Sequence, residues 1–413
     1  MTTSAGCTLT AVGQCIIKED ILASTAPDFQ ELLALTRGSD FCFTSMEGTI
    51  QSCYGGWPMK PAKLTHASDP LVLDCLKSMG FNVLSLVNNH AWDLGAPGIL
   101  SAIAEANARG IPHAGIGADL QSATRPAISV ANGCRVGMVA MDAGPQGDHV
   151  YATDATPQLA ARPGCNPLNL LTTLVVSEDE LATVRAMSEK LNHETRKQSD
   201  RKVGYRQMPG EGFEFYGLRF ATGSTHEERR EPVAEDVKRN LDAIAETAQR
   251  ADFVIAYIHH HHWEPRWEIP PRWFQQFAEA CVDAGAHMVV SHGVPMLQGM
   301  ALYKGAPLFY GLGNFIFHTW QARRYEDERI WQSVVAKVRF DGKAVSGIEI
   351  APIVLGGQRA LETADYDARR VPHLARGAYG EKILQRFAGM SAPFGTRINI
   401  TGDRATVLCG GDS

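Results

Sequence analysis

Asn89, His90 and Asp93 are the residues whose types and spacing most clearly suggest chemistry. They follow the apolar residues 83–87, which have the pattern of a strand buried on both faces, and in open α/β sheets the loops after such strands carry the ligands. Asn89 offers a carbonyl oxygen to a cation, and His90 can donate and accept a proton near neutral pH. Asp93 could bind one ring nitrogen of His90 and fix its tautomer. A polar helix cap after a strand is the alternative, and spacing alone does not separate the two.

Two further strand patterns also end in histidine. Residues 253–258 run into the four histidines 259–262, and residues 288–290 are followed closely by His292. An isolated histidine after a strand is more often structural than a ligand, but three strand ends that each deliver histidine favour one shared site. The four-histidine run lies in mid-chain after a buried strand pattern, which argues against a purification tag.

Tryptophans lie close to these motifs in the sequence. Trp92, Trp263 and Trp267 could line a pocket for a bulky side chain, and we expect Trp92 and Trp263 to contact the substrate. For any one of them, packing in the core is the alternative.

In their order along the chain, these motifs resemble the calcineurin-like metallophosphoesterases and, within them, the poly-γ-glutamate capsule synthesis (CapA-type) branch. The resemblance covers residues 8–318, and four pieces carry it: Asn88-Asn89-His90 with Asp93 and Gly95, the stretch Arg-Pro-Gly-Cys-Asn-Pro-Leu from Arg162, the His292 segment that ends in Leu297-Gln298-Gly299, and residues 309–315. It implies a calcineurin-like two-sheet α/β sandwich with helices on the outer faces. It also implies a metal centre where the strand ends meet.

The resemblance assigns metal ligands residue by residue. Glu47 matches the acid that bridges two metals in the family, Asn89 matches the amide ligand, and His259 or a close neighbour matches the next ligand. His292 matches the first histidine of a late motif, but Gly293 and the residues after it replace the last one.

The first metal position of the family has changed. Where the family has aspartate after its first strand, this chain has Gln14, a neutral amide that could still offer its oxygen to the cation beside Glu47, Asn89, His259 and His292. Because this loss and the missing late histidine fall on the same metal position, we expect one divalent cation. A ligand set rich in oxygen favours Ca²⁺, Mn²⁺ or Mg²⁺ over Zn²⁺.

The residues that acid–base catalysis needs are all present in this pattern. A subset of CapA-like proteins acts in the biosynthesis of ribosomally made lasso peptides, and this chain is similar to that lasso-peptide epimerase type. The resemblance implies inversion of the Cα of the C-terminal residue of a precursor peptide. His90 with Asp93 would serve one face of the carbon and His261 the other, since inversion needs two proton carriers.

Two other classes of function stay open. A metal-dependent phosphoesterase, or a hydrolase of peptides or poly-γ-glutamate, would release products. A binding protein that kept the fold without catalysis is the third class, for which Gln14 and the missing late histidine argue.

The composition is that of a soluble enzyme. The chain has 413 residues, of which 45% are hydrophobic and 20% charged, and its net charge of −6 gives no electrostatic basis for binding nucleic acid. The N-terminus lacks a signal-peptide pattern and no apolar run is long enough to span a membrane, so we expect a cytoplasmic protein without a membrane partner. The oligomeric state stays open.

The nine cysteines form no CxxC pair and are scattered through apolar segments. This distribution predicts reduced, buried thiols. The residues on which this rests are Cys42, Cys75, Cys134 and Cys281.

Strand and helix patterns alternate, which predicts a mainly parallel or mixed sheet covered by helices. Residues 71–79 predict a helix, and residues 334–340 and 345–350 predict antiparallel strands around a turn. We expect a catalytic domain over residues 1–355 and a C-terminal extension, residues 356–413, that packs on it.

A charged segment, residues 193–231, interrupts this alternation as a polar insertion. A solvated loop is the expected structure for most of it, and a lid or substrate groove is the alternative. Residues 356–376 are also expected to form a loop.

Overall fold

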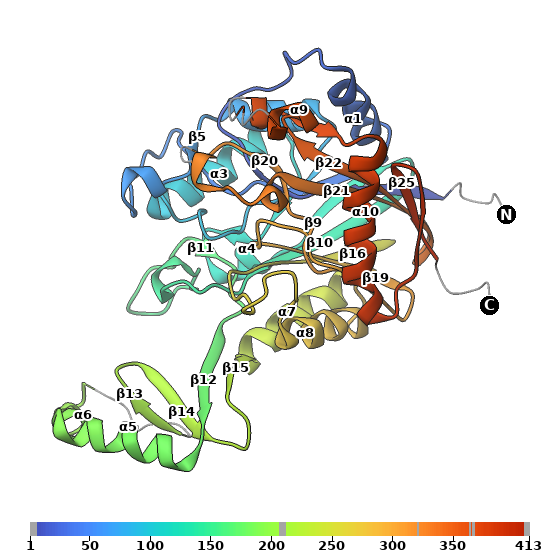
Figure 1. The fold of residues 1–413 in the computed structure, drawn as a ribbon. Coiled ribbons are helices and arrows are strands. Elements are labelled where there is room, and N and C mark those ends of the chain that lie inside the picture. Colours follow the sequence, from blue (N-terminus) through green and yellow to red (C-terminus); the bar gives the residue numbers. More distant parts are fainter. Residues whose placement is uncertain (1–5, 206–211, 320–321, 363–364, 366–367, 409–413) are drawn as a thin grey trace. The chain divides into compact units, whose positions relative to one another are not determined.

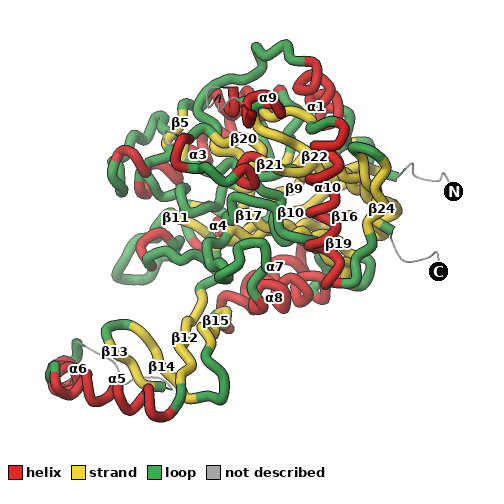
Figure 2. The backbone as a smooth tube through the Cα atoms, viewed as in Figure 1, coloured by secondary structure: helices red, strands yellow, loops and turns green. Residues whose placement is uncertain are grey.

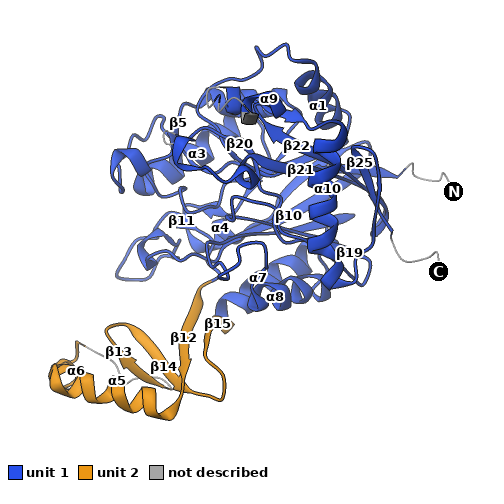
Figure 3. Ribbon diagram, viewed as in Figure 1, with its two compact units in different colours: residues 1–168, 235–413 blue, residues 169–234 orange. Residues whose placement is uncertain are grey.

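The computed structural model in Figure 1 describes residues 6–205, 212–319, 322–362, 365 and 368–408. The chain forms two compact units, which Figure 3 distinguishes by colour. The first combines Met1–Leu168 with Glu235–Ser413, and the second is Asn169–Ala234.

The larger sheet of the first unit is mixed. It consists of β1 (Cys7–Ala11), β3 (Phe41–Ser45), β6 (Val83–Ser85), β7 (His113–Ala114), β21 (Gln332–Asp341), β22 (Ala344–Leu355), β23 (Pro372–Leu374), β24 (Ile398–Thr401) and β25 (Arg404–Val407). The strand order is β24-β25-β22-β21-β1-β3-β6-β7, with β23 beside β22. β1, β3, β6 and β7 run parallel, whereas β21 and β22 pair antiparallel around a turn, as their sequence predicts.

The smaller sheet positions the histidine-rich strand ends. It consists of β9 (Ala127–Ala131), β10 (Cys134–Asp142), β16 (Phe253–His259), β17 (Met288–His292), β18 (Met300–Tyr303) and β19 (Ala306–Phe309). The order is β18-β19-β17-β16-β10-β9, and β10, β16 and β17 are parallel neighbours. Every residue of β16 and β17 is buried, which explains their nearly continuous apolar sequences.

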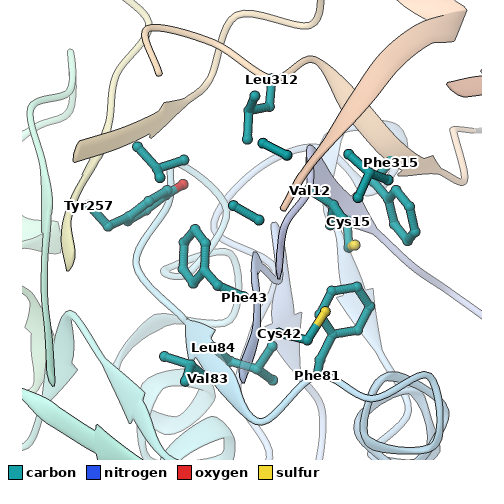
Figure 4. Packing of buried hydrophobic residues seen from close by; sticks show 14 of the residues in the cluster. Val12, Cys15, Cys42, Phe43, Phe81, Val83, Leu84, Tyr257, Leu312 and Phe315 are labelled. Carbon is teal, nitrogen blue, oxygen red and sulfur yellow. The ribbon is translucent and has the colours of Figure 1, made fainter. Parts of the chain in front are cut away.

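The two sheets share one hydrophobic core. The rings of Phe253 and Phe340, which come from different sheets, stack with their centroids 4.2 Å apart. Phe43 of β3 meets Tyr257 of β16 edge-on at 5.4 Å, in the region that Figure 4 shows. The expected two-sheet α/β sandwich is therefore confirmed.

Helices cover the outer sides of the sandwich, as expected (Figure 2). They are α1 (Pro27–Arg37), α2 (Leu71–Ser78), α3 (Gly95–Ala108), α4 (Leu120–Thr124), α7 (Ala234–Ala248), α8 (Arg272–Asp283), α9 (Gly357–Glu362) and α10 (Gly377–Ser391). α7 lies so close to the smaller sheet that a Cβ at Gly137 in β10 would be 2.3 Å from Thr247. α8 contacts β17, and α10 contacts β22, β24 and β25.

Shorter elements complete the first unit. Three pairs of short strands are β2 (Gln14–Ile16) with β20 (Asn314–Phe317), β4 (Thr49–Ile50) with β5 (Ala67–Ser68), and β8 (Ile116–Gly117) with β11 (Gly164–Cys165). The 3-10 helices are η1 (Ala62–Leu64), η2 (Asp148–Val150), η3 (Ala322–Arg324), η4 (Glu328–Trp331), η5 (Ala368–Arg370) and η6 (Ala392–Phe394).

The second unit has its own sheet and helices. Its elements are β12 (Leu170–Val176), α5 (Glu178–Lys190), α6 (His193–Lys202), β13 (Phe213–Phe215), β14 (Leu218–Thr222) and β15 (Glu227–Pro232), with the strand order β13-β14-β12-β15. Ser177 and Glu180 form a reciprocal capping box at the start of α5.

The expectation of a solvated loop over residues 193–231 is wrong for the described part of this segment, and residues 206–211 lie outside the described residues. α6 and three strands lie there, and the unit that contains them begins earlier, at Asn169. Two charged side chains of this unit pack over an aromatic ring: Lys197 in α6 and Arg185 in α5 lie 5.0 and 5.5 Å from the Phe213 ring centroid.

The described C-terminal residues extend the larger sheet. β25 pairs with β22, and β24 pairs with β25. The loop expected over residues 356–376 is wrong in part, because α9, η5 and β23 lie within it. Among the described helices, none is long and apolar enough to cross a membrane.

One cysteine expectation is also wrong. Cys134 is not a free thiol but forms a disulfide with Cys7, which joins β10 of one sheet to β1 of the other. Cys42, Cys75 and Cys281 are free and buried, as expected. The pairing could not be predicted because the two cysteines are 127 residues apart and only the packed sheets bring their Cα atoms to 6.8 Å.

We expect the double variant Cys7→Ala with Cys134→Ala to have a free energy of unfolding about 2–5 kcal/mol lower, because the disulfide restricts the unfolded chain. Urea unfolding of the oxidised protein measures the change. Cys53→Ala is the control, since Cys53 is free and exposed. Equal unfolding midpoints for the double variant and the parent would contradict the prediction.

Candidate metal and proton-transfer site

Polar residues from both sheets meet at one edge of the sandwich. Asp142, His259 and His292 end β10, β16 and β17 and lie side by side in register. From the larger sheet, Glu47 follows β3 and Asn89 follows β6. The Asn89 Oδ1 and His259 Nε2 atoms are 3.1 Å apart, so the strand ends of the two sheets are in direct contact.

Glu47, His259 and His261 form a group that could hold a metal ion. One ligand atom from each lies within 4.8 Å of the others. The Glu47 Oε2 and His261 Nε2 atoms are buried without a hydrogen-bond partner. Burying such atoms unpaired costs free energy, whereas a cation between them would satisfy both. The residues present therefore fit a divalent cation.

The protonation states of this group follow from its burial. Burial raises the pKa of Glu47 to about 8, although the positive charge of Lys60 opposes this shift. Burial, helped by the charge of His90, lowers the pKa of His261 to about 3. His261 is therefore neutral near pH 7, which is the form that binds metals, and cation binding would displace the proton of Glu47.

The structure places the other expected ligands around this group. Asn89 lies next to it through its contact with His259. His292 neighbours His259 in the sheet, but its ring lies parallel to that of Phe43 with the centroids 6.3 Å apart, and it is not part of the group. His261, which we expected to carry protons, belongs to the group.

Gln14 has a structural position. Its Nε2 donates to Asn314 Oδ1 at 3.0 Å, and its Oε1 accepts a hydrogen bond from the Gly293 backbone at 2.8 Å. The amide therefore joins β2, β20 and the loop after β17. An aspartate could not make both contacts, because an ionised carboxylate only accepts hydrogen bonds.

The donor types of the group bear on the metal. The group has fewer oxygen ligands than the expectation of Ca²⁺, Mn²⁺ or Mg²⁺ assumed: two imidazole nitrogens and one carboxylate, with an amide oxygen nearby, suit Mn²⁺ or Zn²⁺ at least as well as Ca²⁺ or Mg²⁺, which prefer oxygen throughout. Within the described part of the chain, this is the one group of three such side chains. A single cation site remains the interpretation that these residues support.

His90 and Asp93 form the expected pair. The His90 Nδ1 and Asp93 Oδ2 atoms are 2.8 Å apart, and the Asp93 side chain is completely buried. Although burial opposes the shift, the hydrogen bond from His90 and the charge of Lys60 lower the pKa of Asp93. Burial lowers the pKa of His90, and Asp93 partly offsets this. The pair therefore combines an anionic carboxylate with a neutral, oriented imidazole.

Sequence reasoning missed two neighbours of this pair. Lys60 Nζ lies 3.0 Å from Asp93 Oδ1 and donates to the backbone oxygen of Asn89 at 2.6 Å. The His66 ring meets the His90 ring edge-on at 4.2 Å. Both residues belong to a long connection without hydrophobic periodicity, so no local signal pointed to them.

Asp142 was also missed, although a signal existed. It directly follows the apolar strand pattern of residues 136–141, as His259 follows its own strand. Its Oδ2 accepts a hydrogen bond from the Tyr151 hydroxyl at 3.2 Å, and burial raises the pKa of Asp142 to about 7.

The tryptophans differ in their surroundings. The ring of Trp263 lies 5.1 Å from that of His261 and 4.1 Å from that of Trp267, so this pair borders the metal-binding group. Trp92 is half-buried against the core, and its ring lies 6.5 Å from that of His149.

We expect Glu47→Gln to lose the bound metal, because the amide removes the only negative charge of the group. Elemental analysis of dialysed protein should fall from one divalent cation per chain to almost none. His226→Asn is the control and should keep its metal, since His226 lies on the surface of the second unit, where it pairs with Glu180. Unchanged metal content in Glu47→Gln, or two tightly held metals in the parent protein, would contradict this assignment.

Comparison with known proteins supports the CapA-type resemblance. The chain is 30% identical over 451 aligned positions to the uncharacterized protein y4sH of Sinorhizobium fredii (strain NBRC 101917 / NGR234), covering 96% of this chain and 91% of that protein. It is 28% identical over 121 positions to the PGA biosynthesis protein CapA of Bacillus subtilis (strain 168), covering 28% of this chain and 31% of that protein.

Among solved structures, the 5'-nucleotidase precursor from Thermus thermophilus aligns with 93% of this chain and with 59% of its own chain, at a TM-score of 0.39 and 9% identity.

Residues 8–319 match the family described as bacterial capsule synthesis protein PGA_cap. Because this match spans most of the sequence, the chain belongs to the PGA_cap family.

Proposed function

We propose that this protein is a metal-dependent hydrolase of the CapA type that cleaves an amide or phosphoester bond, with His90 and Asp93 as its proton-transfer pair. The observation that carries the proposal is an imidazole held by a buried carboxylate beside a group that can bind a cation. Asn89 connects the two parts: its side chain contacts His259, and its backbone oxygen accepts a hydrogen bond from Lys60, which pairs with Asp93.

Each part has a chemical role in such a reaction. When bound, a divalent cation supplies a Lewis acid for a carbonyl or phosphoryl oxygen and lowers the pKa of a coordinated water. His90, as a neutral imidazole, takes a proton from the attacking water and then passes it to the leaving group, and Asp93 holds the ring in the required tautomer. Asn89 and Lys60 keep the two parts at a fixed separation.

The relatives support an amide substrate. CapA of Bacillus subtilis is named for PGA biosynthesis, and another match, from Bacillus anthracis, is named a capsule biosynthesis protein. Poly-γ-glutamate and peptides are both held together by amide bonds. A peptide-like substrate therefore suits both the family and the site.

A second candidate function is inversion of the Cα of the C-terminal residue of a ribosomally made lasso precursor peptide. It is favoured by two partly buried imidazoles that follow strands of different sheets, His90 after β6 and His261 after β16, which are near enough that protonation of one disfavours protonation of the other. Inversion needs two such proton carriers. His261 also belongs to the metal-binding group, and an imidazole that binds a metal cannot carry protons. For this reason hydrolysis ranks first.

One incubation separates the two reactions. The metal-loaded protein is mixed in D₂O with a γ-linked glutamate oligomer, a phosphoester or a linear precursor peptide, and the products are analysed by mass spectrometry. We expect cleavage products from at least one substrate. If the peptide stays intact, gains one deuterium at Cα and has the inverted configuration, the reaction is epimerisation and not hydrolysis. If neither cleavage nor deuterium uptake occurs, the proposed enzymatic activity is refuted.

We expect His90→Asn and Asp93→Asn each to lower kcat by about 10²-fold or more, the usual contribution of general acid–base catalysis, while the metal content stays unchanged. His226→Asn is a matched control: His226 also pairs with a carboxylate, that of Glu180 at 2.6 Å, but on the surface of the second unit. Near-native turnover by His90→Asn would rule out the assigned role.

A further inference from the structure

The connection between β4 and β5, residues 51–66, exposes several large apolar side chains. The exposed fractions are 54% for Tyr54, 73% for Trp57, 52% for Met59 and 47% for Leu64. Single exposed apolar residues are ordinary, but a concentration of them within one short segment usually marks a binding surface. We call residues 51–66 the apolar loop.

Contacts with the segment that carries the proton-transfer pair hold the apolar loop in place. The Met59 backbone donates to the Asp93 backbone oxygen at 2.9 Å, and the Tyr54 backbone donates to Ser101 Oγ at 3.3 Å. Gly56 lies so close to Leu94 that a Cβ there would be 2.5 Å from its backbone oxygen. The backbone is therefore fixed while the apolar side chains are exposed to solvent, which lowers the entropic cost of binding a partner.

The apolar loop also contributes directly to the site. Lys60 pairs with Asp93, and His66 at the end of the loop contacts His90. Trp57 and Met59 are close neighbours of Lys60 in the chain. A molecule whose reacting group reaches His90 therefore lies next to the apolar loop, because Lys60 and His66 of that loop border the pair.

The chemistry of the apolar loop discriminates between substrates. It contains two lysines, Lys60 and Lys63, and no acidic residue. Lys60 is already paired with Asp93, which leaves Lys63 as the positive charge that the loop offers to a polymer with one carboxylate per residue. An aromatic ring of a substrate, by contrast, would bury a large apolar area against Trp57 and Tyr54.

The geometry points to the apolar loop as the substrate-selecting wall of the site, which binds an aromatic or large apolar residue of a peptide next to its reacting bond. This inference rests on the proposed function for the identity of the reaction, but the recognition itself does not require turnover. It assigns a peptide with an apolar end, and not an acidic polymer, as the preferred substrate class.

Binding tests this inference without catalysis. Three fluorescein-labelled probes are titrated with the metal-loaded, full-length protein and followed by fluorescence anisotropy: a hexapeptide that ends in phenylalanine, the same peptide ending in glutamate, and a γ-linked glutamate hexamer. We expect the phenylalanine peptide to bind about tenfold more tightly than either acidic probe, in keeping with aromatic pairing on an exposed surface.

Variants of Trp57 then test whether this residue causes the preference for the phenylalanine peptide. Trp57→Ala should remove most of the preference for phenylalanine, Trp57→Phe should retain most of it, and neither should change the affinity for the glutamate peptide. Val130→Ala is the control, because Val130 is 65% exposed on β9, outside the apolar loop. Circular dichroism verifies that the variants fold.

The outcomes separate this inference from the proposed reaction. Equal binding of the three probes, or an unchanged preference in Trp57→Ala, overturns the role of the apolar loop. A preference for phenylalanine that Trp57→Ala abolishes supports the role, even if no probe is cleaved or exchanged, in which case the proposed reaction alone fails.

Discussion

The buried carboxylate of Asp93 is the contact on which the rest of the site depends. It lies 2.8 Å from the His90 ring nitrogen and 3.0 Å from the Lys60 amine, and it accepts a hydrogen bond from the His66 backbone at 2.7 Å. A carboxylate removed from water remains ionised only with such partners. One side chain therefore orients the proton carrier and also holds two points of the loop that displays Trp57.

A second constraint is the crowding of strand ends. Parallel strands bring Asp142, His259 and His292 to the same edge, yet these three side chains have different surroundings. His259 contacts Asn89 from the other sheet, His292 packs against Phe43, and Asp142 binds the Tyr151 hydroxyl. A position at a strand end makes a residue available for chemistry, and the side chains across the sandwich decide whether it takes part.

Gln14, which stands where the resembled family has an acidic residue, has a structural role. Both polar atoms of the amide are used to join β2 to β20 and to the Gly293 loop. At the position where the resemblance places a ligand of the first metal, this chain has a hydrogen-bonded link. The remaining group, Glu47 with His259 and His261, does not include Gln14 and can hold one cation without it.

The sequence by itself determined many of the elements and the α/β class of the fold. Apolar runs, helix ends and turn residues act locally, so β16, β17, α2 and the β21–β22 hairpin could be predicted from their own residues. The pair of His90 and Asp93 was also predictable, because three residues separate its members and a single turn brings them together.

Only the tertiary structure decided which distant residues meet. The disulfide between Cys7 and Cys134, the place of His261 beside Glu47, and the reach of Lys60 to Asp93 all join segments that are far apart or irregular in sequence. The ordered second unit was missed for a similar reason, because its charged residues are stabilised over rings such as Phe213. Such contacts depend on the direction of each side chain in the packed molecule, and no local pattern encodes that direction.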